Sequence, residues 1–117
     1  MSWPENCTFC RIAAGLARAE ILYEDSEIVA FRDRYPQAPH HVLVIPRRHI
    51  PRLHDVAPSD ALLMGRLLMV AREVAQSLGL ERTGYRIVIN SGAEAGQSIF
   101  HLHVHILGGR AMKWPPG

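Results

Sequence analysis

The stretch QSIFHLHVHILGG, residues 97–109, carries histidines at every second position: His101, His103 and His105. Successive side chains of a β-strand point to opposite faces of a sheet, so an extended segment here places the three imidazoles on one face. The apolar residues between them share the other face, where they can pack into a core. A pair of glycines ends the pattern. The sequence therefore predicts a half-buried strand with a row of imidazoles on one side.

A row of imidazoles has four interpretations. Imidazole acts as a nucleophile, a proton carrier and a metal ligand near neutral pH. The row is therefore a metal site, a nucleophilic site, or both at once. The fourth interpretation is a solvated face that happens to be rich in histidine. Protonated neighbours repel one another, so the pattern favours a chemical role over the solvated face.

The sequence outside the histidine segment predicts short strands and two helices. Alternating apolar residues predict a hairpin, a central strand that is apolar on both faces, and one more strand before the histidines. A long helix begins at the N-cap Ser59 and stops at Gly79, and a short helix ends before Gly15. The predicted ranges are 8–14 and 59–78 for the helices, and 21–24, 27–31, 41–45 and 85–90 for the strands. We expect an α+β domain with one antiparallel sheet of about five strands, one long helix and one short helix.

Length and composition limit the classes of protein. A chain of 117 residues with 48% apolar residues is enough for one domain with a core. The formal charge of +2 gives no argument for binding nucleic acid or a membrane. No apolar run is long enough to span a bilayer, and the first residues show no secretory signal. We therefore expect a cytoplasmic protein, in which two cysteines are thiols or metal ligands rather than a disulfide.

Three longer stretches carry a family resemblance. His-x-His-x-His followed by an apolar residue resembles the signature of the histidine triad superfamily of nucleotide hydrolases and transferases. GQSIFHLHVHILGGRAMKWPPG, AFRDRYPQAPHHVLVIPRRHI and GYRIVINSGAEAGQS resemble the histidine triad nucleotide-binding proteins, which form the purine nucleoside phosphoramidase branch. The similarity covers nearly the whole chain. It implies a histidine triad (HIT)-like fold over residues 1–117 as a single domain, and a homodimer.

The surplus of apolar residues on the long helix fits a second subunit. Five apolar residues widen the apolar surface beyond the stripe that one sheet would cover: Leu62, Met64, Leu68, Met69 and Ala75. A more deeply buried helix is the alternative.

Cys7 and Cys10 form a Cys-x-x-Cys pair with three interpretations: a redox pair, half of a zinc site, or two unconnected thiols. A zinc site needs two more ligands to complete a tetrahedron, and His49 and His101 are candidates. The resemblance implies the same set, because some bacterial members and the related galactose-phosphate uridylyltransferases bind zinc in this way. Zn²⁺ on Cys7, Cys10, His49 and His101 would be structural, since four protein ligands leave no open position.

The resemblance also implies a nucleotide site. Without it, an Asp in a loop is a turn cap and isolated Phe or Ile residues are core. With it, an aspartate holds the ribose hydroxyls, apolar side chains line the base pocket, polar side chains line the phosphate site, and a tryptophan in the C-terminal tail reaches the partner subunit's site. These nucleotide-binding residues are Asp33, Phe9, Ile12, Phe31, Asn90, Gln97, Ser98 and Trp114. Arg34 departs from the family pattern, in which an apolar residue is common.

The expected reaction is nucleotidyl transfer to water. The middle histidine, His103, is the best nucleophile, with its second ring nitrogen donating to a backbone carbonyl. His105 would bond a phosphate oxygen or the leaving group, and Ser98 or His105 would relay a proton to a departing amine. His101 completes the catalytic set and holds the metal. His41 resembles a family histidine behind the catalytic imidazole, or is structural.

The family implies hydrolysis of purine nucleoside 5′-monophosphoramidates through a covalent nucleotidyl-histidine intermediate. Two other functions stay open. A sister branch with the same triad hydrolyses dinucleoside polyphosphates. A nucleotide-binding regulatory module without physiological catalysis would also keep these residues. Zinc storage or redox chemistry at the cysteines alone would leave His103 and His105 unexplained.

Overall fold

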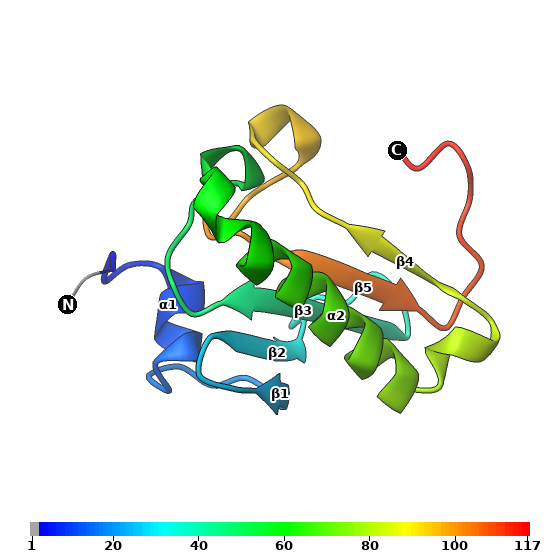
Figure 1. Cartoon of the computed structure of the whole chain (residues 1–117). Coiled ribbons are helices and arrows are strands. Elements are labelled where there is room, and N and C mark those ends of the chain that lie inside the picture. Colours follow the sequence, from blue (N-terminus) through cyan, green and yellow to red (C-terminus); the bar gives the residue numbers. More distant parts are fainter. Residues whose placement is uncertain (1–2) are drawn as a thin grey trace.

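The computed structural model describes residues 3–117 and contains one five-stranded antiparallel sheet with the strand order β1-β2-β3-β5-β4 (Figure 1). A short and a long helix complete the α+β architecture, which confirms the predicted fold class. The strands are β1 (Ile21–Glu24), β2 (Ile28–Arg32), β3 (His40–Pro46), β4 (Tyr85–Val88) and β5 (Val104–Gly108). The helices are α1 (Thr8–Ala13) and α2 (Ala61–Ser77).

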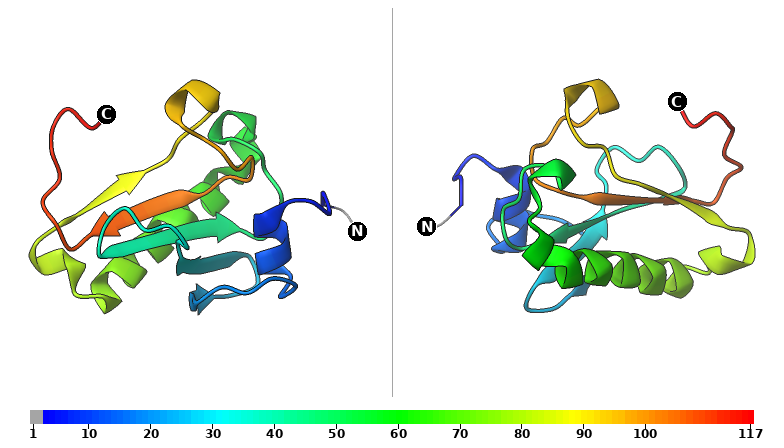
Figure 2. Two further views of the ribbon diagram at one scale, coloured as in Figure 1. Left: turned by 180° about the vertical axis from the view of Figure 1, so that it is seen from behind. Right: turned by 45° about the horizontal axis from the view of Figure 1, so that its top comes forward.

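The long helix α2 covers one face of the sheet, and the main core lies between them (Figure 2, right). Leu67, Val70 and Val74 recur at helical spacing and are buried against the sheet. The apolar residues that alternate with the histidines enter this core as predicted, with Val104 1% and Ile106 0% exposed. Each such side chain stabilises the fold by about 1.5–3 kcal/mol. Because Val104 and Ile106 face this core, the residues that alternate with them on β5 face the opposite side of the sheet.

The opposite face of the sheet is covered mainly at one end, where α1 packs beside the end of β3 (Figure 2, left). A smaller apolar cluster forms there from Phe9 of α1 and from residues of β2 and β3. His105 of β5 lies opposite Leu43 of β3 in the antiparallel register. The histidines therefore lie on this second face, beside the smaller cluster.

The strand that carries the histidines is shorter than predicted. β5 begins only at Val104, so His101 and His103 precede it. These two side chains are more buried than a half-buried strand implies, at 0% and 8% exposure. The reason is tertiary, because α1 and its Phe9 cover this end of the sheet.

The start of α2 also differs from the prediction. A 3-10 turn over Pro58–Asp60 precedes the helix, which begins at Ala61, so Ser59 is not its N-cap. The Asp60 carboxylate instead accepts a hydrogen bond from the Ala57 N–H at 3.1 Å and stabilises that turn. Pro58 favours this outcome, since its fixed φ suits the first residue of a helical turn. The predicted stop is confirmed, because Gly79 adopts φ 75° directly after the last turn.

The outer side of α2 exposes large apolar side chains, with Leu62 79%, Leu68 49% and Met69 54% exposed. Ala75 is buried and Met64 packs partly buried on the main core, so these two do not belong to the exposed surplus. Within residues 3–117, no helix is both long and apolar enough to cross a bilayer.

Candidate functional site

The three histidines of the triad segment face three different sets of neighbours. His101 is fully buried, and its Nε2 lies 2.8 Å from the backbone oxygen of Pro46. A carbonyl only accepts, so Nε2 carries the proton and Nδ1 keeps a free electron pair. That tautomer makes the Nδ1 of His101 available as a ligand.

The Nδ1 of His101 points at a cluster of three other donor atoms. It lies 3.4 Å from the Sγ atoms of both Cys7 and Cys10, and 3.2 Å from the Nδ1 of His49. The Cys10 Sγ lies 3.2 Å from the His49 Nδ1. One turn of α1 brings the two thiols together, and His49 comes from the loop after β3. The structure thus brings together all four predicted ligands, in a cluster that could hold a metal ion.

Metal binding would change the protonation state of Cys10. Burial, with a contribution from the neighbouring Cys7, raises the pKa of the Cys10 thiol to about 12. A bound cation reverses this, because a metal ligates the thiolate and displaces its proton.

His103 is held as a neutral imidazole with one free nitrogen. Its Nδ1 donates to the backbone oxygen of His101 at 2.7 Å, so its Nε2 carries the electron pair. The ring lies edge-on to Phe9, with 5.1 Å between ring centroids. Burial lowers the pKa of His103. At neutral pH the side chain therefore presents an unprotonated Nε2, as an attacking nucleophile must.

His105 carries a proton on its Nε2, whereas the Nε2 of His103 carries an electron pair. The Gln37 N–H donates to the Nδ1 of His41 at 3.0 Å, so His41 carries its proton on Nε2. That Nε2 donates to the Nδ1 of His105 at 2.9 Å, which leaves the proton of His105 on Nε2. Within the described residues, this buried Nε2 has no hydrogen-bond partner. His105 thus offers an N–H to a ligand beside the electron pair of His103, with 4.9 Å between the two ring centroids.

Removing His41 tests the relay that sets the proton of His105. In His41→Ala, the Nδ1 of His105 loses its donor, so the proton is free to occupy either ring nitrogen. We expect turnover to fall about 10- to 100-fold, as it does when groups that orient active-site histidines are removed. The measurement is the steady-state rate with a nucleotide substrate, with His54→Ala, an exposed histidine, as the control. An unchanged rate in His41→Ala would contradict the relay.

Stability should depend on pH through His105. Burial, with smaller contributions from His103 and His41, lowers the pKa of His105 to about 4. An unfolded histidine titrates near 6.5, so between pH 6.5 and 4 the unfolded chain binds more protons than the folded one. Stability is therefore complete above pH 6.5 and falls as the pH is lowered toward 4.

Thermal unfolding between pH 7.5 and 4.5 checks this expectation. We expect the melting temperature to fall by at least about 5 °C across the range, and by less in His105→Gln. An equal fall in the variant would show that other groups carry the pH dependence.

The predicted nucleotide-binding residues lie in different surroundings. Asp33 follows β2, accepts from the Tyr35 N–H at 2.8 Å and approaches the Nε2 of His41 to 3.4 Å, so its carboxylate lies beside the relay. Phe9 and Phe31 are buried and pack edge to face at 5.4 Å, and Ile12 packs on their cluster. The aromatic pair is thus part of the smaller apolar cluster and exposes little surface to a nucleotide base.

The polar residues before the triad differ in how free their side chains are. Gln97 is buried, and its amide donates to the backbone oxygens of Pro51 and Ile99 and accepts from the Gly92 N–H. It therefore braces the loop that leads into the triad. Ser98 is exposed and Asn90 is partly exposed.

Trp114 is 82% exposed in the tail, and the neighbouring Lys113 accepts a hydrogen bond from Arg86 through its backbone oxygen. The structure places Trp114 in solvent rather than against the triad of its own chain.

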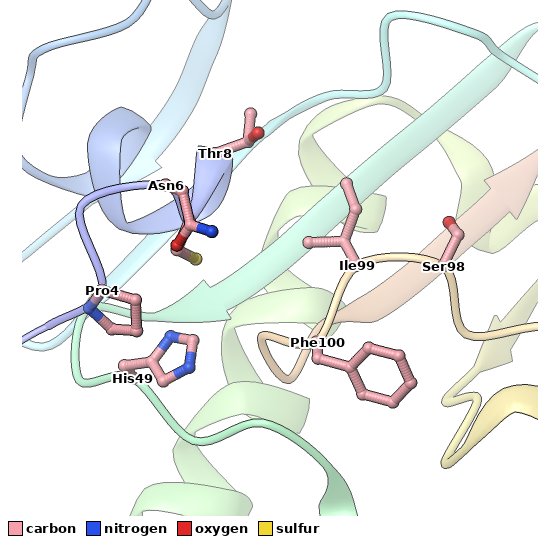
Figure 3. A pocket seen from close by; sticks show the side chains of 8 residues that line it. Pro4, Asn6, Thr8, His49, Ser98, Ile99 and Phe100 are labelled. Carbon is pink, nitrogen blue, oxygen red and sulfur yellow. The ribbon is translucent and has the colours of Figure 1, made fainter.

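A pocket of about 320 Å³ opens beside the metal-ligand cluster (Figure 3). One wall is the segment from Pro4 to Thr8, the other is Ser98–Phe100, and His49 lies between them. The Ile99 side chain points across the gap toward the first wall. Sequence reasoning did not identify this pocket, because its two walls are more than 80 residues apart in the chain.

A five-stranded antiparallel sheet that presents His-x-His-x-His on its less covered face defines a histidine triad protein. The chain belongs to the HIT domain family, whose model matches residues 15–112. It is 50% identical over 113 residues to an uncharacterised HIT-like protein of Synechocystis, covering 97% of this chain and 98% of that relative.

Solved structures show the same relationship. A HIT family hydrolase from Legionella pneumophila is 48% identical, covers 96% of this chain and 100% of its own, and superimposes with a TM-score of 0.94. A zinc-bound histidine triad family protein from Mycobacterium smegmatis is 34% identical and covers 90% of this chain and 76% of its own, with a TM-score of 0.76.

Proposed function

We propose that this HIT protein hydrolyses the P–N bond of purine nucleoside 5′-monophosphoramidates. One observation carries the proposal. The backbone and His41 fix opposite tautomers in two adjacent neutral histidines, so His103 offers an electron pair and His105 offers an N–H. A phosphoryl group placed between them meets a nucleophile and a hydrogen-bond donor at once.

In the first step, the Nε2 of His103 attacks phosphorus and forms a P–N bond, while the bond to the leaving amine breaks. The amine nitrogen needs a proton to depart, and His105 or the Ser98 hydroxyl relays one from solvent, taking up a proton as it gives one to the amine, so that neither side chain is left charged. The positive charge that develops on the His103 ring is stabilised by its Nδ1–H bond to the His101 carbonyl. The product of this step is a nucleotidyl-histidine and a free amine.

In the second step, water attacks the same phosphorus and the His103–phosphorus bond breaks. The attacking water releases one proton to solvent through the same relay, and the nucleoside monophosphate leaves. Both steps need donors placed on the phosphoryl oxygens, and backbone amides near Ser98 can provide them. A zinc ion on four protein ligands would have no open position for water or substrate, so we assign both steps to side chains and backbone groups.

The nucleotide contacts follow from the positions of the remaining residues. Asp33 accepts hydrogen bonds from the ribose hydroxyls, as a carboxylate suits a vicinal diol. Asn90 and Ser98 contact the phosphate, and Gln97 acts by holding their loop. Ile12 forms the apolar side of the base site, and the buried Phe9 and Phe31 support it from behind. Trp114 acts in the partner subunit's site.

The Cys/His cluster fits structural zinc. With Zn–S near 2.3 Å and Zn–N near 2.05 Å, the edges of a tetrahedron are about 3.5 Å for N···S and about 3.4 Å for N···N. The observed N···S distances of 3.2–3.4 Å and N···N distance of 3.2 Å are close to these values. Cys7, Cys10, His49 and His101 would hold the ion with no open position. The ion would then crosslink α1, the loop after β3 and the triad segment.

We further propose a cytoplasmic homodimer that binds neither nucleic acid nor membranes. The exposed Leu62, Leu68 and Met69 of α2 support a subunit interface, because water would otherwise surround this apolar side. Two unpaired cysteines suit a reducing compartment.

The deciding experiment measures AMP release from adenosine 5′-phosphoramidate and from diadenosine polyphosphate in parallel. We expect faster release from the phosphoramidate. Preference for the dinucleotide would assign the protein to dinucleoside polyphosphate hydrolysis. Tight AMP binding without turnover of either compound would instead identify a nucleotide-binding regulatory module.

A further inference from the structure

The Cys/His cluster and the nucleophile share one peptide group. The carbonyl between His101 and Leu102 accepts from the Nδ1 of His103 at 2.7 Å, and the N–H of the same peptide donates to the backbone oxygen of Ile50 at 2.6 Å. His101 belongs to the cluster, and Ile50 directly follows its third member, His49. Two metal-ligating positions therefore flank the peptide that orients the nucleophile.

The ring of His101 anchors this peptide from the side. Its Nε2 is held by the Pro46 carbonyl at 2.8 Å, and its Nδ1 faces the cysteine sulfurs and His49. With an ion on Nδ1, the ring is fixed at both nitrogens and cannot turn. The carbonyl of the same residue then keeps one direction, toward His103.

A second connection runs through α1. Phe9 lies between Cys7 and Cys10 in sequence, and its ring contacts His103 edge-on at 5.1 Å and 88°, and His101 at 6.0 Å. A six-residue helix is far too short to be stable alone, so α1 depends on its tertiary attachments. The two cysteines are attachments on either side of Phe9. The cluster thus determines where the Phe9 ring meets the nucleophile.

We infer that the metal centre positions the nucleophile: through the His101 carbonyl and the Phe9 ring, it holds the His103 imidazole in the orientation for attack. The inference rests on the proposed function for its catalytic consequence. Phe9 and His101 act here as positioning residues. Loss of the ion leaves the nucleotide contacts at Asp33 and Asn90 in place but frees the ring of His103. A misplacement of about 1 Å can cost about 100-fold in rate.

The first test compares zinc-loaded and metal-free protein, with folding checked by circular dichroism. Mixing with adenosine 5′-phosphoramidate and intact-mass spectrometry give the rate at which nucleotidyl-His103 forms, and calorimetry gives the AMP dissociation constant. We expect formation to slow about 10- to 100-fold in the metal-free protein, with AMP affinity within about twofold. Equal rates in both forms would overturn the inference, and so would a parallel loss of rate and affinity.

A second variant covers the case in which metal-free protein does not fold. Phe9→Leu keeps the ligands and most of the apolar volume but removes the edge contact, whereas Val29→Ala loosens the same apolar cluster. We expect Phe9→Leu, loaded with zinc, to slow nucleotidyl-His103 formation about tenfold at saturating substrate, where a change of affinity at the base site does not enter the rate. A larger effect of Val29→Ala would show that general packing, rather than the Phe9 contact, governs the nucleophile.

A measurement without substrate separates this inference from the proposed function. The Nδ1–H of His103 is a buried hydrogen-bonded proton, and NMR of ¹⁵N-histidine-labelled protein detects it directly. We expect its signal in zinc-loaded protein and its loss or broadening in metal-free protein and in Phe9→Leu. An unchanged signal would overturn the inference even if the protein is an active phosphoramidase. A changed signal in a protein without turnover would support the positioning while rejecting the proposed reaction.

Discussion

His103→Ala is expected to lower phosphoramidate hydrolysis by at least about 10⁴-fold while leaving the fold intact. Removing the nucleophile of a covalent mechanism has effects of this size, since the positioned donors that remain supply only a small part of the acceleration. The ring of His103 contacts Phe9 and donates one hydrogen bond, to a backbone carbonyl. Its removal leaves a cavity at the edge of the smaller apolar cluster, so the free energy of unfolding should fall by only about 1–3 kcal/mol.

The measurement combines AMP release with a search for the covalent intermediate by mass spectrometry. The wild-type protein should carry a nucleotidyl group on His103 during turnover, and His103→Ala should carry none. His54→Ala, which changes an exposed histidine, is the matched control and should behave as the wild type. In His103→Gly, free imidazole should restore part of the activity by entering the vacated space. Retained turnover in His103→Ala would reject the assignment of the nucleophile.

Loss of the metal ligand His49 is expected to have the largest effect on stability. A metal that binds only the folded state stabilises it by about 4 kcal/mol when its free concentration is 1,000 times the dissociation constant. For a domain of this size, His49→Asn should then lower the melting temperature by at least about 10 °C.

Thermal unfolding of the zinc-loaded proteins, with the metal content measured alongside, checks this expectation. His54→Asn is the matched control, because it makes the same change at an exposed position in the segment after β3. A chelator should lower the melting temperature of the wild type to that of His49→Asn and leave the variant unchanged. Wild-type protein purified without added metal that contains no stoichiometric zinc would reject the zinc proposal.

Local pattern was enough to predict the sheet and its core face. The strict alternation around Val104 and Ile106 has only one arrangement that buries the apolar residues, because a shift of one residue would expose all of them. Gly79 at the end of α2 was equally predictable, since its positive φ favours glycine. The order of the strands brings the cysteines, His49 and the triad to one side of the sheet. The family resemblance predicted this grouping.

The proton positions on the histidines could not be predicted in full from the sequence. They depend on the Pro46 carbonyl, the His101 carbonyl and the Gln37 N–H. These are backbone groups, and they leave no mark in the pattern of side chains. Only the fold decides which of them lies against which ring nitrogen. The burial of His101 under α1 is tertiary in the same way, and the N-cap of α2 was missed because Pro58 and Asp60 form a competing turn.

Within residues 3–117 the buried Nε2–H of His105 has no acceptor, and this has a thermodynamic consequence for the whole domain. A buried donor without an acceptor costs about 1–3 kcal/mol, which is a substantial part of the stability of a small domain. An apolar side chain of similar volume at this position would remove that penalty, so the native sequence is not the most stable one for this fold. Any ligand whose oxygen accepts from this N–H relieves the penalty as it binds. Occupancy of the site and resistance to unfolding are therefore linked at a single hydrogen atom.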